Sequence, residues 1–190
     1  MTFSIVTACS RPENLHAIMK SILEAKPPND LLWVRYHDLS VFIEQRHKFF
    51  TYSDKFTCLD SVYFSGRVGE GAKGWGHAAR NRWLETNTLG WTYFLDDDNL
   101  MHPNFFEGFE MGSSKNVIIL GQETAQGLRE PGRSVCNVDL GQLVFRRECV
   151  GDLRFNLHYE ADGEFIERLT SVVPCNFVSG KFTYYNRLRW

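Results

Sequence analysis

Apolar runs and amphipathic stretches alternate along the first part of the chain. Residues 3–8 (FSIVTA) are apolar and β-branched, which is typical of a buried strand. Apolar side chains then recur at helical spacing, at Leu15, Ile18, Met19, Ile22 and Leu23. Ser10 and Asn14 are the candidate caps of this helix, and residues 31–38 (LLWVRYHD) predict a second strand. A strand, a helix and a strand within about forty residues have the size of a βαβ unit with parallel strands.

The alternation continues through the rest of the chain. Further strands are predicted at residues 61–66, 91–95, 117–122, 138–147 and 172–177. Helices are predicted at residues 40–50, 77–87 and 159–169, and the four glycines of residues 67–76 (RVGEGAKGWG) predict a loop. This order predicts an α/β fold, an α/β/α sandwich around a mostly parallel mixed sheet. A chain of 190 residues is expected to form a single compact domain.

Composition and charge restrict the classes of partner. The net charge is −2, from 21 basic and 23 acidic residues without a basic run, which argues against nucleic acid as a partner. Five cysteines are widely spaced and form no C-x-x-C pair, so we expect reduced thiols and a cytoplasmic protein. No apolar run is long enough to span a bilayer, so no integral membrane segment is expected.

Polar clusters follow three of the predicted strands. They are Thr7 to Arg11, Asp38, and the consecutive Asp96, Asp97 and Asp98. Ligands of open α/β sheets bind at the carboxyl ends of the strands, where these clusters are expected to meet. Three adjacent carboxylates at the end of a buried strand repel one another, and a divalent cation such as Mn²⁺ or Mg²⁺ would neutralise them. The alternative is an acidic turn or a helix cap near His102.

Asp162 lies in the first turn of the helix predicted at residues 159–169. Phe165, Ile166 and Leu169 form the apolar face of that helix, and Asp162 leans toward the same side. A carboxylate so placed is a candidate general base. It is equally suited to stabilise the helix N-terminus, and on chemistry alone Glu160 and Glu164 remain candidates for the base.

Segments of the chain resemble a known enzyme family. FSIVTACSRPENLHAIMKSI, HAARNRWLE, GWTYFLDDDNLMHPNF, DLGQLVFRREC and ADGEFIERL, in this order, are similar to the GT-A glycosyltransferases, especially the family-2 inverting enzymes. The similarity covers residues 3 to about 169. It implies a metal-dependent transfer of a sugar from a nucleotide-diphosphate donor, most simply a UDP-sugar, to a hydroxyl of a carbohydrate or glycan acceptor. It also implies a nucleotide-binding half, residues 1–99, and an acceptor-binding half, residues 100–190.

The resemblance also implies a role for each matching acidic residue. Asp98 would bind Mn²⁺ or Mg²⁺, Asp96 would face the ribose, and Asp97 would face the donor site. Asp162 stands where the family has its catalytic base. The family's adjacent Glu-Asp pair is replaced here by Glu160-Ala161-Asp162, which puts the shape of the acceptor side in question.

Other positions would bind the nucleotide. Thr7 and Arg11 would line the base pocket, and Asp38 would accept from the uracil N–H. Lys73 and Arg80 would approach the diphosphate. The alternatives are a solvated loop lysine and an exposed helix charge, since Arg80, Asn81 and Arg82 cannot share one helix face.

Two other functions are compatible with the same residues. The same aspartates would serve a nucleotidyltransferase or phosphohydrolase, although CSRPEN lacks the glycine-rich signature of the former. A non-catalytic nucleotide-sugar binding module is the other alternative. The segment NRLRW (186–190) is similar to the Gln-x-x-Arg-Trp signature of processive synthases, with Asn186 in place of Gln, and we expect it to be frayed.

Overall fold

The computed structural model describes residues 2–38, 61–64, 75–135 and 137–189. The predicted helix at residues 40–50 and most of the predicted glycine loop lie outside these ranges. The described strands are β1 (Phe3–Cys9), β2 (Leu31–Asp38), β3 (Ser61–Phe64), β4 (Trp91–Phe94), β5 (Leu100–Met101), β6 (Val117–Thr124), β7 (Gly127–Arg129), β8 (Leu143–Arg146) and β9 (Cys175–Tyr184). The described α-helices are α1 (Leu15–Glu24), α3 (Trp75–Thr86), α4 (Phe105–Gly112) and α5 (Ala161–Val172).

All of these strands belong to one mixed sheet. Its order is β3-β2-β1-β4-β8-β6-β9-β5, and β7 pairs with β6 at the side. β1 is parallel to β2 and β4, β2 is parallel to β3, and β6 is parallel to β9. Because β8 is antiparallel to both β4 and β6, these two run in the same direction. Most of the described strands therefore point the same way, which confirms the predicted α/β fold with a mostly parallel mixed sheet.

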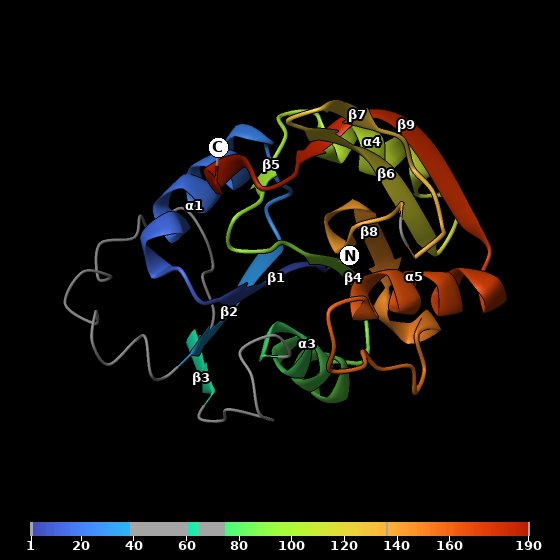
Figure 1. The fold of residues 1–190 in the computed structure, drawn as a ribbon, viewed down its shortest axis with the longest axis horizontal. Coiled ribbons are helices and arrows are strands. Elements are labelled where there is room, and N and C mark those ends of the chain that lie inside the picture. Colours follow the sequence, from blue (N-terminus) through green and yellow to red (C-terminus); the bar gives the residue numbers. More distant parts are fainter. Residues whose placement is uncertain (1, 39–60, 65–74, 136, 190) are drawn as a thin grey trace.

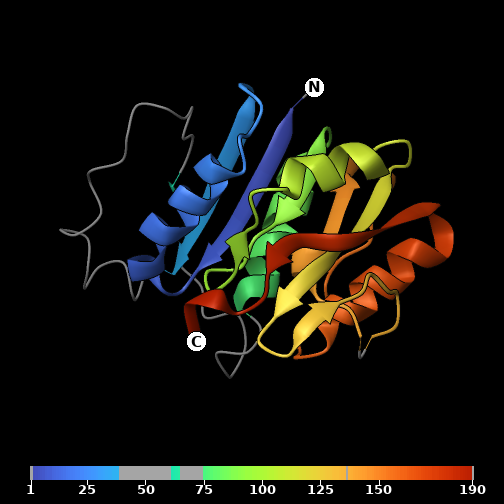
Figure 2. The same ribbon diagram turned by 90° about the horizontal axis from the view of Figure 1, so that it is seen from above.

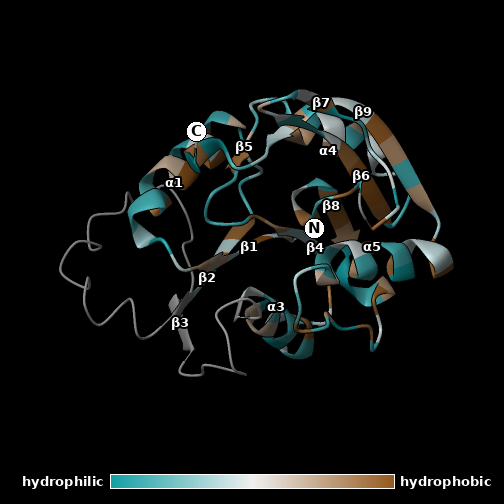
Figure 3. Cartoon of the chain, in the orientation of Figure 1, coloured by the Kyte–Doolittle hydropathy of each residue, from teal (hydrophilic) through white to brown (hydrophobic). Residues whose placement is uncertain are grey.

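The helices cover both faces of a curled sheet (Figure 1). The apolar faces of α1 and α4 pack on one side, where Ile18, Ile22 and Phe105 join the core around Trp33 and Tyr93. On the other side, apolar residues of α3 and α5 form a second core cluster, which contains Ala79, Trp83, Leu84, Phe165, Ile166 and Leu169. In Figure 3 hydrophobic residues, in brown, occur along the strands, while much of the helices' surface is hydrophilic, in teal.

β9 is bent, and the bend decides where the following residues lie. The register of β9 against β6 shifts between Leu120 and Gln122. Gly121 and Gly180 meet at this point, where a Cβ on Gly121 would lie 2.1 Å from the Gly180 carbonyl oxygen. Gly180 has a φ of 140°, which side chains disfavour. Beyond the bend β9 pairs with β5 and leads back toward α1 (Figure 2).

Several local predictions differ from the structure. The strand predicted at residues 138–147 begins only at Leu143, because Asp139 starts a 3-10 turn, Leu140–Gln142, through a capping box with Gln142. The short strands β5 and β7 carry too few residues for a pattern to reveal them. Asn14 is the N-cap of α1, but neither its side chain nor that of Ser10 caps the helix; both contact Asp97 instead.

Two further properties bear on the chemistry of the chain. Cys9, Cys149 and Cys175, the cysteines within the described residues, are free thiols. Among the described helices, none has the length and apolar character needed to cross a membrane.

Candidate active site

Asp97, in the loop that follows β4, binds the loop that follows β1 through hydrogen bonds and an ion pair. Its Oδ2 accepts hydrogen bonds from the backbone N–H groups of Ser10 and Arg11, at 2.6 and 2.7 Å, and from the Ser10 hydroxyl. Its Oδ1 pairs with the Arg11 guanidinium at 2.6 Å. Asn14 donates to the Asp97 carbonyl oxygen at 2.8 Å. With all these partners, the 4% exposed Asp97 shapes the loop that carries Arg11.

Asp98 is the second buried carboxylate of the trio, also with 4% exposure. Its Oδ2 lies 3.1 Å from the Arg11 guanidinium and forms a further ion pair with Arg189. Burial raises the pKa of Asp98, and the neighbouring Asp96 raises it further, while Arg189 and Arg11 act against this rise. The negative charge of Asp98 is thus balanced by two guanidinium groups, those of Arg11 and Arg189.

The segment that carries Arg189 lies along the turn after β4. The Leu188 N–H donates to the Asp98 carbonyl oxygen at 3.1 Å, and the Asn186 N–H donates to Asn99 Oδ1 at 2.7 Å. These contacts hold the 3-10 turn η5, Arg187–Arg189, over the aspartates. The expectation of a frayed segment here is therefore wrong for residues 186–189, because the bend in β9 returns them to the site.

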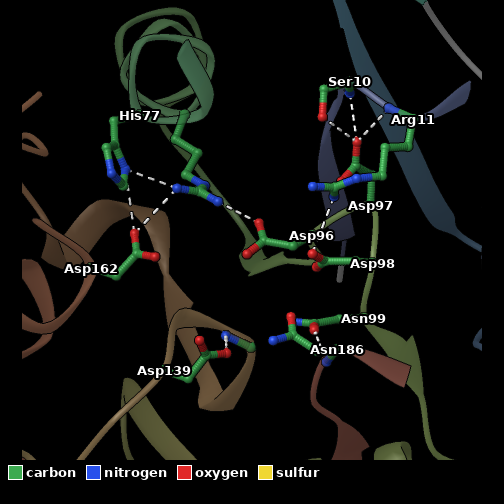
Figure 4. A network of polar contacts seen from close by, with 12 residues as sticks. Ser10, Arg11, His77, Asp96, Asp97, Asp98, Asn99, Asp139, Asp162 and Asn186 are labelled. Atoms are coloured by element: carbon green, nitrogen blue, oxygen red, sulfur yellow. Dashed lines mark hydrogen bonds and ion pairs between the residues drawn. The ribbon is translucent and has the colours of Figure 1, made fainter. Parts of the chain in front are cut away.

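Arg80 joins Asp96 to Asp162. Asp96, Asp162 and His77 point toward the same space in Figure 4. One guanidinium nitrogen pairs with Asp96 Oδ1, and the other lies 3.2 Å from Asp162 Oδ1 and 2.8 Å from His77 Nδ1. Arg80 is 6% exposed, so the alternative of an exposed helix charge does not hold for this residue. Burial opposes the charge of Arg80, but Asp96 and Asp162 outweigh it and raise its pKa. Arg80 therefore stays charged and holds the two carboxylates together.

The protonation of Asp162 is set by opposing effects. Burial raises the pKa of Asp162 to about 7, and Asp96 and Asp139 add to this, although Arg80 lowers it. For the neighbouring imidazole, burial and Arg80 lower the pKa of His77 to about 4, so His77 is neutral near pH 7. His77 Nδ1 lies 3.3 Å from Asp162 Oδ1. Asp162 is not the N-cap of α5, which is Glu160, and its described partners are Arg80 and His77.

Helix α3 is oriented by contacts on the side of Phe155. The Asn81 side chain accepts from the Phe155 N–H at 2.8 Å and donates to its carbonyl oxygen at 2.9 Å. The Phe155 ring stacks on Phe165 of α5 at 4.0 Å and on His77 at 5.7 Å. These contacts join α3 to α5, and they fix Arg80 and Asp162 at hydrogen-bonding distance.

Asp139 is a further carboxylate on the same side of the sheet (Figure 4). Its Oδ1 accepts from the Gly141 N–H at 2.9 Å and from the Gln122 amide at 3.1 Å. Burial raises the pKa of Asp139, and the charge of Asp96 raises it further. Asp139 is thus a structural cap whose charge bears on the same site as Asp96 and Asp162.

The other predicted site residues lie in different surroundings. Thr7 is fully buried in β1, and its hydroxyl accepts from the Trp33 indole N–H at 3.1 Å, so its side chain faces the core. Asp38 is the last residue of β2, directly after His37, which aligns with Cys9 of β1. Lys73 lies outside the described residues. Direct contacts bring the other predicted residues together in two neighbouring groups, Arg11 with Asp97 and Asp98, and Arg80 with Asp96 and Asp162.

Sequence reasoning missed three members of this network, His77, Asp139 and Arg189. His77 precedes Arg80 by one helical turn, and this spacing is a usable signal for a shared face. The capping box of Asp139 and Gln142 was also readable as a helix-start pattern. No pattern in the sequence around Arg189 predicts its contact with Asp98, because that contact depends on the path of β9.

The donor atoms suit a hard divalent cation at Asp98. Mn²⁺ and Mg²⁺ prefer carboxylate oxygen and retain water or phosphate oxygens in their shells. Within the described residues no group of three or more His, Cys, Asp or Glu side chains is arranged to hold a metal. One carboxylate that already attracts two guanidinium groups fits an ion that takes its remaining ligands from a diphosphate and water.

Comparisons with known proteins bear on the fold. TarS of S. aureus, residues 1–349, solved in complex with UDP-GlcNAc, superposes with a TM-score of 0.68 at 13% identity, over 97% of this chain and 58% of that one. The mannosyltransferase PcManGT of Pyrobaculum calidifontis, in complex with GDP-Man and Mn²⁺, gives 0.66 at 14% identity, over 97% and 56%. The chain has the GT-A fold.

The comparisons also set the extent of this likeness. The GT-A fold spans nearly the whole chain, which itself corresponds to little more than half the length of these two structures. No protein-family model and no curated protein matches the sequence.

Proposed function

We propose that the chain is a metal-dependent inverting glycosyltransferase that moves a sugar from a nucleotide-diphosphate donor, most simply a UDP-sugar, to a hydroxyl of a carbohydrate acceptor. The observation that carries this proposal is the Arg80 bridge, which holds Asp162 beside the aspartates that follow β4. A half-buried carboxylate with a pKa of about 7 is suited to accept a proton near neutral pH. TarS with UDP-GlcNAc and PcManGT with GDP-Man support the donor class.

Asp162 acts as the general base in this proposal. Its Oδ1 accepts from Arg80 at 3.2 Å, which leaves Oδ2 to take the proton of the acceptor hydroxyl. The hydroxyl oxygen attacks the anomeric carbon as its proton passes to Asp162, and the bond from that carbon to the diphosphate breaks. Attack on the face opposite the leaving group inverts the configuration. Holding donor and acceptor in line supplies the entropic part of the rate.

The donor is held by the residues around β1, β2 and β4. As the family resemblance implies, Asp96 would bind the ribose, and Arg11 and Asp38 would bind the nucleotide base. Asp98 would hold the divalent cation, which as a Lewis acid neutralises the charge that develops on the leaving diphosphate. Asp97 keeps Arg11 in place through its contacts with the loop after β1.

A screen for donor hydrolysis tests this function. The protein is incubated with UDP-, GDP-, ADP- and dTDP-sugars, with and without Mn²⁺, and nucleoside diphosphate release is measured. Release from one donor that requires Mn²⁺ and is lost in Asp162→Asn supports the proposal. Release of a sugar 1-phosphate, with the nucleoside monophosphate either transferred or set free, would indicate nucleotidyl transfer or phosphohydrolysis instead.

A non-catalytic nucleotide-sugar binding module is the second candidate. It is favoured by the arginine partners that all three consecutive aspartates already have. Titration calorimetry with the same nucleotide sugars separates the two functions. Donor binding without release of nucleoside diphosphate, in the presence of several sugar acceptors, would favour the binding module.

A further inference from the structure

Arg189 is the cationic partner of Asp98 that comes from the segment after β9. Its guanidinium pairs with Asp98 Oδ2, while the backbone of η5 bonds to the Asp98 carbonyl oxygen through Leu188. Asn186, which begins this segment, has a φ of 48°, a left-handed conformation that asparagine tolerates better than most residues. The turn thus places a positive charge at the oxygen expected to bind a divalent cation.

The two arginines at Asp98 differ in how firmly they are held. Arg11 also pairs with Asp97 Oδ1 at 2.6 Å, and its backbone N–H is bonded to Asp97 Oδ2. Arg189 has a side chain that is 52% exposed, and Asp98 is its described ion-pair partner. A long, exposed side chain regains rotamer freedom and hydration when it leaves an ion pair. Arg189 is therefore the easier of the two to displace.

A divalent ion and the Arg189 guanidinium cannot share this oxygen at low cost. A metal ion bound to a carboxylate oxygen lies about 2.0–2.6 Å from it, in the space that the guanidinium fills. The like charges would also repel, and this repulsion is weakly screened because Asp98 is buried.

We infer that Arg189 is an internal competitor of the divalent cation at Asp98. The guanidinium neutralises Asp98 while no metal is bound, and it leaves Oδ2 when the ion enters. Arg11 remains on Asp97 in both states. This inference rests on the proposed metal site at Asp98 but does not depend on sugar transfer.

Mn²⁺ binding in the presence of a fixed excess of UDP, which supplies the diphosphate oxygens, tests the competition without any sugar donor. Free Mn²⁺ is measured by electron paramagnetic resonance while the protein is titrated, for the wild type and for Arg189→Gln, Arg189→Lys, Arg82→Gln and Asp98→Asn. Arg82 is the matched control, because it is an exposed arginine whose ion-pair partner is Glu85 of the same helix. Arg189→Gln is expected to bind Mn²⁺ about two- to fivefold more tightly, the range that an exposed ion pair supports. Arg189→Lys and Arg82→Gln should remain near the wild type.

The outcomes separate this inference from the proposed function. If Arg189→Gln binds Mn²⁺ no more tightly than the wild type while Asp98→Asn loses binding, the competition is refuted and the metal site stands. If Asp98→Asn binds Mn²⁺ like the wild type, the ion lies elsewhere, and both the competition and the metal role of Asp98 fail. If Arg82→Gln binds Mn²⁺ as tightly as Arg189→Gln does, the gain in affinity comes from the loss of one positive charge of the protein alone. This result would also overturn the inference.

Discussion

Asp96 and Asp162 bind the same guanidinium, although one follows a central strand and the other begins a helix much later in the chain. Arg80 thereby links the residue proposed to bind the donor ribose to the residue proposed to take the acceptor proton. The two ends of the reaction share one buried cation, so changes at either aspartate act on the other.

Asp162→Asn tests the proposed base. Asparagine keeps the size of the side chain and can still face Arg80, but it cannot take up a proton at neutral pH. We expect transfer to fall by about 10²–10⁴-fold while donor affinity changes little. Initial rates and donor calorimetry on the same preparation measure the two quantities. Glu160→Gln, at the exposed N-cap of α5, is the matched control and should remain active; the reverse result would assign the base to Glu160.

The pH dependence of transfer follows from the raised pKa of Asp162. The base works when ionised, so the rate should increase with pH and reach half of its plateau near pH 7. If the transfer rate instead reaches half of its plateau near pH 4, where an ordinary aspartate titrates, Asp162 does not control the rate.

The same shift predicts an effect on stability. Because folding raises the pKa of Asp162 from 3.8 to about 7, the folded state binds the proton more strongly. The stability from this group is present below pH 3.8 and is lost as the pH rises toward 7. The free energy of unfolding of Asp162→Asn, compared with that of the wild type, should therefore become relatively larger across this window. Urea denaturation at several pH values measures the difference, in which the contribution of His77 to both proteins largely cancels. A difference independent of pH would contradict the assigned shift.

Arg80→Gln should destabilise the fold. It leaves the half-buried Asp96 and Asp162 without their cation, so we expect a loss of about 1–3 kcal/mol, less than for a fully buried charge pair. Urea denaturation measures the loss. Arg82→Gln, on the exposed side of the same helix, should change the free energy of unfolding by less than about 1 kcal/mol. Equal effects of the two substitutions would refute a structural role of the Arg80 bridge.

Gly163→Ala should displace the start of α5. A Cβ at this position would lie 2.5 Å from the Val135 carbonyl oxygen, and backbone cannot yield as a flexible side chain can. We expect a loss of about 1–3 kcal/mol, with reduced transfer because Asp162 is the preceding residue. Gly132→Ala is the control, since the nearest atom there is 4.0 Å away. Thermal unfolding and transfer rates compare the two variants, and an unaffected Gly163→Ala would mean that α5 tolerates a shift.

Sequence patterns predicted the parts of this molecule that depend on local periodicity. β1, β2 and β4 follow runs of apolar side chains, and α1 follows apolar side chains at helical spacing. The meeting of Arg11 with the aspartates follows from the shared edge of parallel strands. The partners of Arg80 could not be read from its helix, because helical spacing gives a face but not what packs on it. The place of Arg189 could not be predicted for a similar reason, since it depends on a bend at Gly180 that pairing across the sheet creates.

The anchoring of the chain just before η5 determines how fast Arg189 can leave Asp98. The Tyr185 N–H donates to the Glu123 carbonyl oxygen at 2.8 Å, so the chain is anchored to β6 immediately before Asn186. Release of Arg189 therefore needs movement of a side chain or a few residues, which takes nanoseconds to microseconds. Typical enzymes turn over about ten times per second. The exchange of arginine for metal would thus equilibrate many times within one catalytic cycle, and it would change the apparent affinity for the ion without limiting the rate.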